Sequence, residues 1–142
     1  MQVDKPNYTS HQSYLQSVVA SQSCTQWTFK QEPLFMEILE NVSKDYGVQY
    51  LQHIEEDFPM VTFDILRNYV NTNDKYGNAN KTIFTTKDKK LLYCSPTSLR
   101  YLYHALVLVD AYKLSGCRKM IELGSGYGGL CLAVQMLSLI HI

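Results

Sequence analysis

The chain has 142 residues, of which 46% are hydrophobic and 18% charged, a composition typical of globular rather than disordered proteins. Thirteen basic and thirteen acidic residues give a formal net charge of zero, so the charge favours neither nucleic acid nor an anionic membrane as a partner. The first twenty residues lack the apolar core of a signal peptide, and no apolar run reaches the length of a membrane span, so we expect a cytoplasmic protein.

The cysteines do not have the spacing of a zinc site. Cys24, Cys94, Cys117 and Cys131 include no CxxC pair, and no histidine lies at zinc-finger spacing. We therefore expect no metal, and reduced, partly buried thiols, with disulfides as the alternative.

The first two thirds of the chain favour helices. Pro33 suits a first helical turn, and the apolar residues after it recur at helical spacing. Turn-forming residues predict a loop over Asn71–Asn78. The predicted helices cover residues 8–21, 33–39, about 47–57, and a segment that begins at Pro59.

The strongest predicted helix begins at Ser95-Pro96. Serine is a good N-cap residue and proline fits the first helical position. Gly116 is a plausible end of this helix. One face is lined by Leu99, Leu102, Leu106 and Val109.

A glycine-rich turn follows a predicted short strand, Met120–Leu123. Gly124, Gly126 and Gly128 alternate, and glycine both adopts positive φ freely and lets the backbone approach a ligand. A helix that begins near Gly129 would point its free N–H groups at whatever occupies the turn.

Two classes of cofactor fit this spacing. Gly124-x-Gly126-x-x-Gly129 matches the dinucleotide fingerprint, whereas Gly124-x-Gly126-x-Gly128 after Glu122 resembles motif I of class I S-adenosyl-L-methionine-dependent methyltransferases. A carboxylate at Glu122 would repel a pyrophosphate but favour an ammonium and a sulfonium. We therefore prefer S-adenosyl-L-methionine; the alternatives are an NAD(P)- or FAD-dependent oxidoreductase and a non-catalytic helical interaction domain with a structural turn. The expected cofactor-binding residues are Glu122, Gly124, Ser125, Gly126 and Gly128.

Three segments together resemble a family of sugar O-methyltransferases: Asn73–Asn78, Ser95–Tyr101 and Ile121–Cys131. The resemblance implies methyl transfer to a hydroxyl of a free, nucleotide-linked or glycan sugar. Arg100 and Tyr103 are the candidate substrate-binding residues. A hydroxyl is a weak nucleophile that needs a base or a metal, yet the sequence identifies no catalytic residue.

The expected fold class is α/β. A helical N-terminal region over 1–94 leads into the first β-strand and glycine turn of a Rossmann-like methyltransferase domain over 95–136. Only eighteen residues follow Gly124, fewer than a βαβ unit needs, so we expect a truncated fold without activity. Residues 137–142 resemble one reading frame of a sequencing-library adaptor and predict a non-native tail; the alternative is a native helix continuation.

Overall fold

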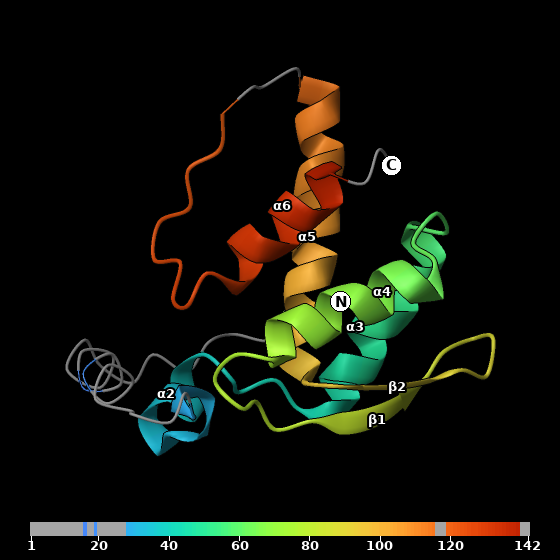
Figure 1. Ribbon diagram of the computed structural model, residues 1–142. Coiled ribbons are helices and arrows are strands. Elements are labelled where there is room, and N and C mark those ends of the chain that lie inside the picture. Colours follow the sequence, from blue (N-terminus) through green and yellow to red (C-terminus); the bar gives the residue numbers. More distant parts are fainter. Residues whose placement is uncertain (1–15, 17–18, 20–27, 116–118, 140–142) are drawn as a thin grey trace.

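The computed structural model describes residues 16, 19, 28–115 and 119–139. A long helix, α5, runs through the middle of the molecule, with α3, α4 and α6 packed against it and a β-hairpin at the end where α5 begins (Figure 1). The elements in chain order are η1 (Phe29–Gln31), α2 (Pro33–Ile38), α3 (Lys44–Asp57), α4 (Phe63–Asp74), β1 (Thr82–Thr85), β2 (Leu91–Cys94), α5 (Pro96–Ser115) and α6 (Gly129–Leu139).

Side-chain caps set the starts of the longer helices. Ser43 Oγ accepts a hydrogen bond from the Tyr46 N–H at 3.3 Å, so α3 begins at Lys44, three residues before its predicted start. Thr62 caps α4 in the same way, which corrects the predicted start at Pro59. The predicted start of α5 is confirmed, because Ser95 Oγ accepts from the Thr97 N–H at 3.2 Å.

The main core lies between α3, α4, α5, α6 and the inner face of the hairpin. The leucines predicted to line one face of α5 contribute to it: Leu99, Leu102 and Leu106 are buried, and Val109 is partly buried. The other large buried side chains of this core include Tyr50, Ile54, Leu66, Tyr69, Val70, Phe84 and Leu92.

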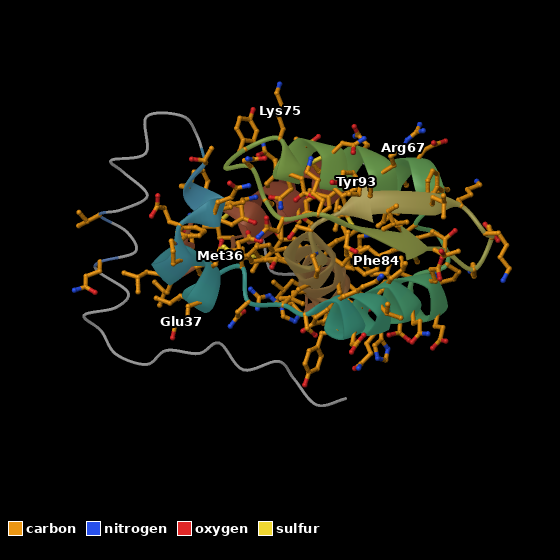
Figure 2. All side chains as sticks on the ribbon, turned by 90° about the horizontal axis from the view of Figure 1, so that it is seen from below. Met36, Glu37, Arg67, Lys75, Phe84 and Tyr93 are labelled. Atoms are coloured by element: carbon orange, nitrogen blue, oxygen red, sulfur yellow. The ribbon has the colours of Figure 1, made fainter. Side chains whose placement is uncertain are left out.

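The hairpin was not predicted, and it corrects the expectation that residues 1–94 are helical. β1 and β2 pair antiparallel, with Ile83 opposite Tyr93 and Phe84 opposite Leu92. Phe84 and Leu92 point into the core, whereas Ile83 and Tyr93 are exposed. Figure 2 shows Phe84 between the hairpin and α3, where its ring lies over Gly47.

The predicted strand over Met120–Leu123 does not form, which corrects the expected Rossmann-like opening. Ile121 is 84% exposed and Leu123 is 91% exposed. A strand needs a hydrogen-bonded neighbour, and within the described part of the chain the only strands, β1 and β2, pair with each other. The described residues therefore form a mixed α and β structure without a parallel sheet.

The ends of other predicted elements also differ from the structure. Helix α4 continues to Asp74, so the first half of the predicted Asn71–Asn78 loop is helical. The predicted helix start near Gly129 is confirmed by α6. Helix α6 runs on to Leu139, and Leu137 is 2% exposed in the core, the position that a helix continuation gives it. Gly116 and most of the predicted helix over residues 8–21 lie outside the described residues.

Candidate functional site

The glycine turn (Gly124–Gly129) has the backbone conformation that its sequence predicts. The φ angles are 72° at Gly124, 57° at Gly126 and 85° at Gly128, a region that side chains other than glycine rarely adopt. The Gly128 N–H donates to the Ser125 carbonyl at 2.9 Å and closes the turn. The alternating glycines are therefore required by the backbone.

Crowding separates these glycines into two kinds. A Cβ added at Gly124 or Gly128 would meet no atom of the described residues within 4 Å, the two chain neighbours aside, so both positions are open in the described part of the chain. A Cβ at Gly129 would lie 2.9 Å from the rings of Tyr101 and Tyr127, so this glycine is required by packing. One side of the turn thus faces protein and the other faces open space.

Glu122 contacts the helix that follows the turn. Cys131 Sγ donates a hydrogen bond of 2.6 Å to Glu122 Oε2. This bond is the main cause of a raised pKa of the exposed Cys131 thiol, and burial contributes less. The predicted cofactor-binding residues Glu122, Gly124, Ser125, Gly126 and Gly128 lie together on the segment between α5 and α6, drawn in orange in Figure 1.

Tyr127 points the other way, into the protein. Its ring centroid lies 5.7 Å from that of Tyr101, 5.9 Å from Phe29 and 6.2 Å from Phe35. The Lys30 ammonium sits 4.0 Å from the centroid of the Tyr127 ring, within cation–π range. Tyr127 therefore ties the glycine turn to η1, α2 and α5.

The Tyr127 hydroxyl reaches a group of buried polar side chains, here called the polar cluster: Lys30, Glu40, Asn73, Asp74, Ser95 and Ser98. Asn73 Nδ2 donates to Tyr127 Oη at 3.2 Å and to Ser98 Oγ at 2.7 Å. Ser98 Oγ donates in turn to Asp74 Oδ1 at 2.6 Å, and the Ser95 N–H donates to Asp74 Oδ2 at 2.7 Å. A continuous hydrogen-bonded chain thus runs from the glycine turn to the start of α5.

This chain brings together the three segments that carry the family resemblance. Asn73 and Asp74 belong to the first segment, Ser95 and Ser98 to the second, and Tyr127 to the third. The sequence indicated these segments separately, but their side chains meet in one buried site. Neither Lys30 nor Tyr127 was singled out as a site residue, and a lone lysine in a polar stretch carries no sequence signal of burial.

Lys30 and Glu40 are the buried charges of the polar cluster. Lys30 Nζ donates to the Asn73 carbonyl at 3.0 Å and lies 4.0 Å from Glu40 Oε1. Ser95 Oγ donates to Glu40 Oε2 at 3.0 Å, whereas Oε1 accepts no hydrogen bond from any described residue. Burial lowers the pKa of Lys30 and raises the pKa of Glu40, and in each case it outweighs the attraction between the two groups.

The two candidate substrate-binding residues both contact other protein groups. Arg100 is buried, and its Nη2 donates to the Leu39 carbonyl at 3.2 Å while its Nη1 donates to Asn41 at 3.3 Å. These bonds tie the segment after α2 to α5. Tyr103 packs against Tyr50 and His53 of α3, so the structure does not bring it to the glycine turn.

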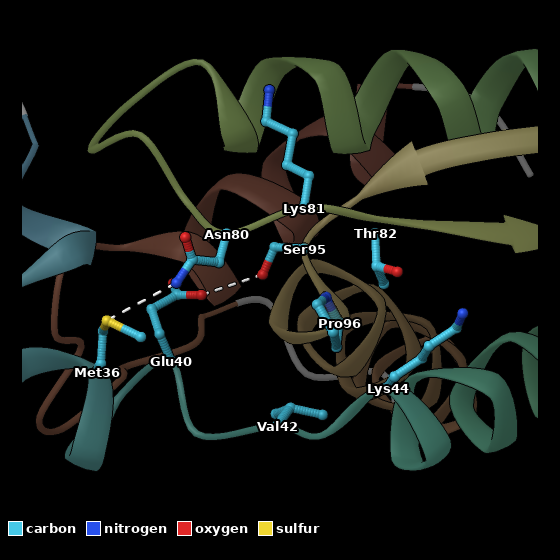
Figure 3. Close-up of a pocket in the computed structure, with 9 residues that line it drawn as sticks. All are labelled: Met36, Glu40, Val42, Lys44, Asn80, Lys81, Thr82, Ser95 and Pro96. Carbon is cyan, nitrogen blue, oxygen red and sulfur yellow. Dashed lines mark hydrogen bonds between the residues drawn. The ribbon is translucent and has the colours of Figure 1, made fainter.

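A cavity of about 300 Å³ lies beside the polar cluster. Glu40, Asn80 and Ser95 point toward one another there, whereas Lys44 and Lys81 extend away from the centre (Figure 3). The remaining lining residues are Met36, Val42, Thr82 and Pro96. The cavity is therefore bordered by the same network that holds Tyr127.

Within the described residues, no group of three or more histidine, cysteine or acidic side chains is placed to bind a metal, and no helix is both long and apolar enough to cross a bilayer. Cys94 is buried and free, and Cys131 is exposed and free, while Cys24 and Cys117 lie outside the described residues. Comparison with protein-family models, with curated proteins and with solved structures gave no match.

Proposed function

We propose that this protein binds S-adenosyl-L-methionine at the glycine turn and acts as a methyltransferase. The observation that carries the proposal is the open left-handed turn. Gly124 and Gly128 have positive φ, and no described residue other than their chain neighbours has an atom within 4 Å of an added Cβ. Positive φ alone requires glycine at these positions, and the open space beside them lets a ligand approach the backbone closely.

The chain offers complementary groups for the two ends of this cofactor. The Glu122 carboxylate, half-buried before the turn, suits the ammonium of the methionine part. The free N–H groups at the start of α6 suit the carboxylate of that part, and the glycine backbone leaves room for the ribose. Bound S-adenosyl-L-methionine supplies an electrophilic methyl group, and the residues named here orient it.

Glu122 also favours S-adenosyl-L-methionine over a dinucleotide cofactor. A dinucleotide places a pyrophosphate against such a turn, where a carboxylate two residues before the first glycine repels it. The hydrogen bond from Cys131 leaves Glu122 close to the turn. We therefore keep the oxidoreductase only as an outcome of the test.

We further propose a sugar hydroxyl as the methyl acceptor. Support comes from the family resemblance and from the contacts among its three segments around Asn73, Ser98 and Tyr127. Arg100 and Tyr103 are not used in this proposal, because Arg100 bonds to the segment after α2 and Tyr103 packs against α3. The test of the acceptor is transfer of label from S-adenosylmethionine to separate panels of sugars, proteins, nucleic acids and phenols.

The cofactor is tested by ligand-detected NMR, which measures weak binding, on the full chain with S-adenosylhomocysteine and with NAD. We expect a signal with S-adenosylhomocysteine, and a weaker one in Glu122→Gln, which removes the charge and keeps the shape. Glu56→Gln, an exposed position on α3, is the matched control. Binding of NAD alone would support the oxidoreductase, and binding of neither ligand would support a non-catalytic domain.

A further inference from the structure

We propose that Tyr127 is a positioning residue, which holds the glycine turn in its left-handed conformation through its contacts with Lys30 and Asn73. The effect of Tyr127 on cofactor affinity rests on the proposed function. The effect of Tyr127 on the conformation of the turn concerns the free protein, so the two effects are measured separately.

The first support is the contrast between Tyr127 and its neighbours. Ser125 and Gly126 are exposed, while the Tyr127 ring is surrounded by Phe29, Phe35 and Tyr101. The segment 119–128 contains no helix or strand, so its shape depends on side-chain contacts in addition to the backbone hydrogen bond between Gly128 and Ser125. Tyr127 supplies such contacts from the middle of the turn.

The second support is the environment of the Lys30 cation. The Lys30 side chain is completely buried, and its carboxylate partner, Glu40 Oε1, is 4.0 Å away, at the long limit of an ion pair. Lys30 Nζ also donates to the Asn73 carbonyl at 3.0 Å, and the face of the Tyr127 ring, 4.0 Å away, adds to the stabilisation of this charge. Removal of the ring takes one of these contacts from a buried ammonium, so the ring and the cation support each other.

The third support is the hydroxyl. Asn73 shares its Nδ2 between Tyr127 Oη and Ser98 Oγ, which fixes the depth to which Tyr127 enters the protein. Gly129 packs against the Tyr127 and Tyr101 rings, so that depth also fixes the start of α6. A shift of Tyr127 would therefore disturb both the turn and the first N–H groups of α6.

Pre-ordering of the turn has a defined effect on binding. A ligand that needs the left-handed turn binds with an apparent Kd that rises in inverse proportion to the fraction of molecules in that conformation. Tyr127 and Lys30 act through the turn and need not contact the ligand. Affinity for a ligand at Glu122 and Gly124 thus depends on residues buried behind the turn.

The test is amide hydrogen exchange of the free protein, measured for peptides that cover residues 122–132 and the hairpin. Tyr127→Leu removes the aromatic ring, whereas Tyr127→Phe keeps the ring and loses only the hydroxyl. Lys30→Met removes the charge and keeps a side chain of similar length. Tyr93→Leu, an exposed tyrosine of the hairpin, is the control. We expect exchange at 122–132 to rise about tenfold in Tyr127→Leu and Lys30→Met, with less than about a threefold rise in Tyr127→Phe and no change in the hairpin.

Two results would overturn the proposal: unchanged exchange at 122–132, or an equal rise in every peptide, which would mean that Tyr127 only stabilises the whole fold. If Tyr127→Leu does not fold, Lys30→Met and Tyr127→Phe carry the same comparison. Titration with S-adenosylhomocysteine then tests the consequence, with an apparent Kd that rises in inverse proportion to the fraction of molecules that keep the left-handed turn. A local rise in exchange in a protein that binds no S-adenosylhomocysteine supports the positioning role and rejects the proposed function.

Discussion

The thiol of Cys131, in the first turn of α6, donates a hydrogen bond to the carboxylate of Glu122, nine residues earlier and on the other side of the glycine turn. The two ends of the turn are therefore linked by one acid and one thiol. Because only the protonated thiol can donate this hydrogen bond, the contact raises the pKa of Cys131 above its usual value of 9.0, and the charge of the carboxylate adds to the effect.

Glu122→Gln should therefore make Cys131 more reactive. Loss of the charge lowers the pKa of the thiol toward 9.0, and the thiolate is the reactive form. We expect alkylation by iodoacetamide at pH 8 to accelerate about threefold or more. Glu56→Gln is the control, and peptide mass spectrometry separates Cys131 from buried Cys94. An unchanged rate at Cys131 would show that the contact with Glu122 is absent in solution.

Gly126→Val should prevent binding of S-adenosylhomocysteine. A branched side chain resists a φ of 57°, and an added Cβ would lie 3.2 Å from Leu39. Gly124→Ala, which has the strain without the crowding, should destabilise the fold by only about 1–2 kcal/mol. Calorimetric titration measures binding and urea denaturation measures stability. Full affinity in Gly126→Val would remove the turn from the binding site.

Gly47→Ala should destabilise the protein although alanine favours helices. An added Cβ at this position in α3 would lie 2.7 Å from the buried Phe84 ring and 3.0 Å from Pro96. We expect a loss of about 1–3 kcal/mol in the free energy of unfolding. The loss caused by Gly47→Ala should be smaller in a Phe84→Leu background, because leucine leaves more room for the added Cβ. A stabilised Gly47→Ala variant would contradict the packing of the hairpin on α3.

Leu137→Ala should lower the free energy of unfolding by about 2–4 kcal/mol, since this side chain of α6 is buried in the core. Leu123→Ala is the matched control, because the same atoms are removed from a side chain that is 91% exposed; its effect should stay within about 0.5 kcal/mol. Urea denaturation measures both. Equal effects of the two substitutions would show that the end of α6 does not pack in solution.

The pH dependence of stability should change in Glu40→Gln. Burial raises the pKa of Glu40 above 4.5, so the folded state holds a proton that the unfolded state has released. Stability from this group is thus greatest below pH 4.5 and falls as the pH rises through the raised pKa of the folded state. Relative to the wild type, Glu40→Gln should become more stable as the pH rises across that window.

Lys30 has the opposite effect on the pH dependence of stability, although burial is again the cause. Its pKa is lowered by burial, so the folded state loses a proton before the unfolded state does, and stability rises with pH toward the ordinary pKa of 10.5. Urea denaturation of the wild type, Glu40→Gln and Lys30→Met at several pH values separates the two groups. A constant difference between Glu40→Gln and the wild type at all pH values would contradict the raised pKa of Glu40.

The sequence predicted those features that depend on local chemistry. Ser95 and Pro96 fixed the start of α5, and the alternating glycines fixed the left-handed turn, because caps and positive φ are properties of single residues. The hairpin was missed because its strands have four residues each and the positive φ in its connection falls on Lys89, where no glycine signals a turn.

The remaining differences are tertiary effects. Met120–Leu123 has the composition of a strand, but strand formation depends on a neighbour that no local pattern supplies. The burial of Lys30 depends on Asn73 and Tyr127, which lie 43 and 97 positions away in the chain. Contacts of such separation are invisible to periodicity and spacing, which is why the polar cluster emerged only in the structure.

The complete burial of Lys30 protects the peptide bond that follows it from trypsin, since the protease must take the lysine side chain into its own pocket. Cleavage after Lys30 therefore requires η1 to leave the Tyr127 ring, and the cleavage rate reports how often this happens. A molecule that binds the exposed glycines and stabilises the position of Tyr127 should slow trypsin cleavage after Lys30, which is far from the glycine turn in the sequence. Resistance to a protease thus becomes a way to screen for the ligand without assuming its identity.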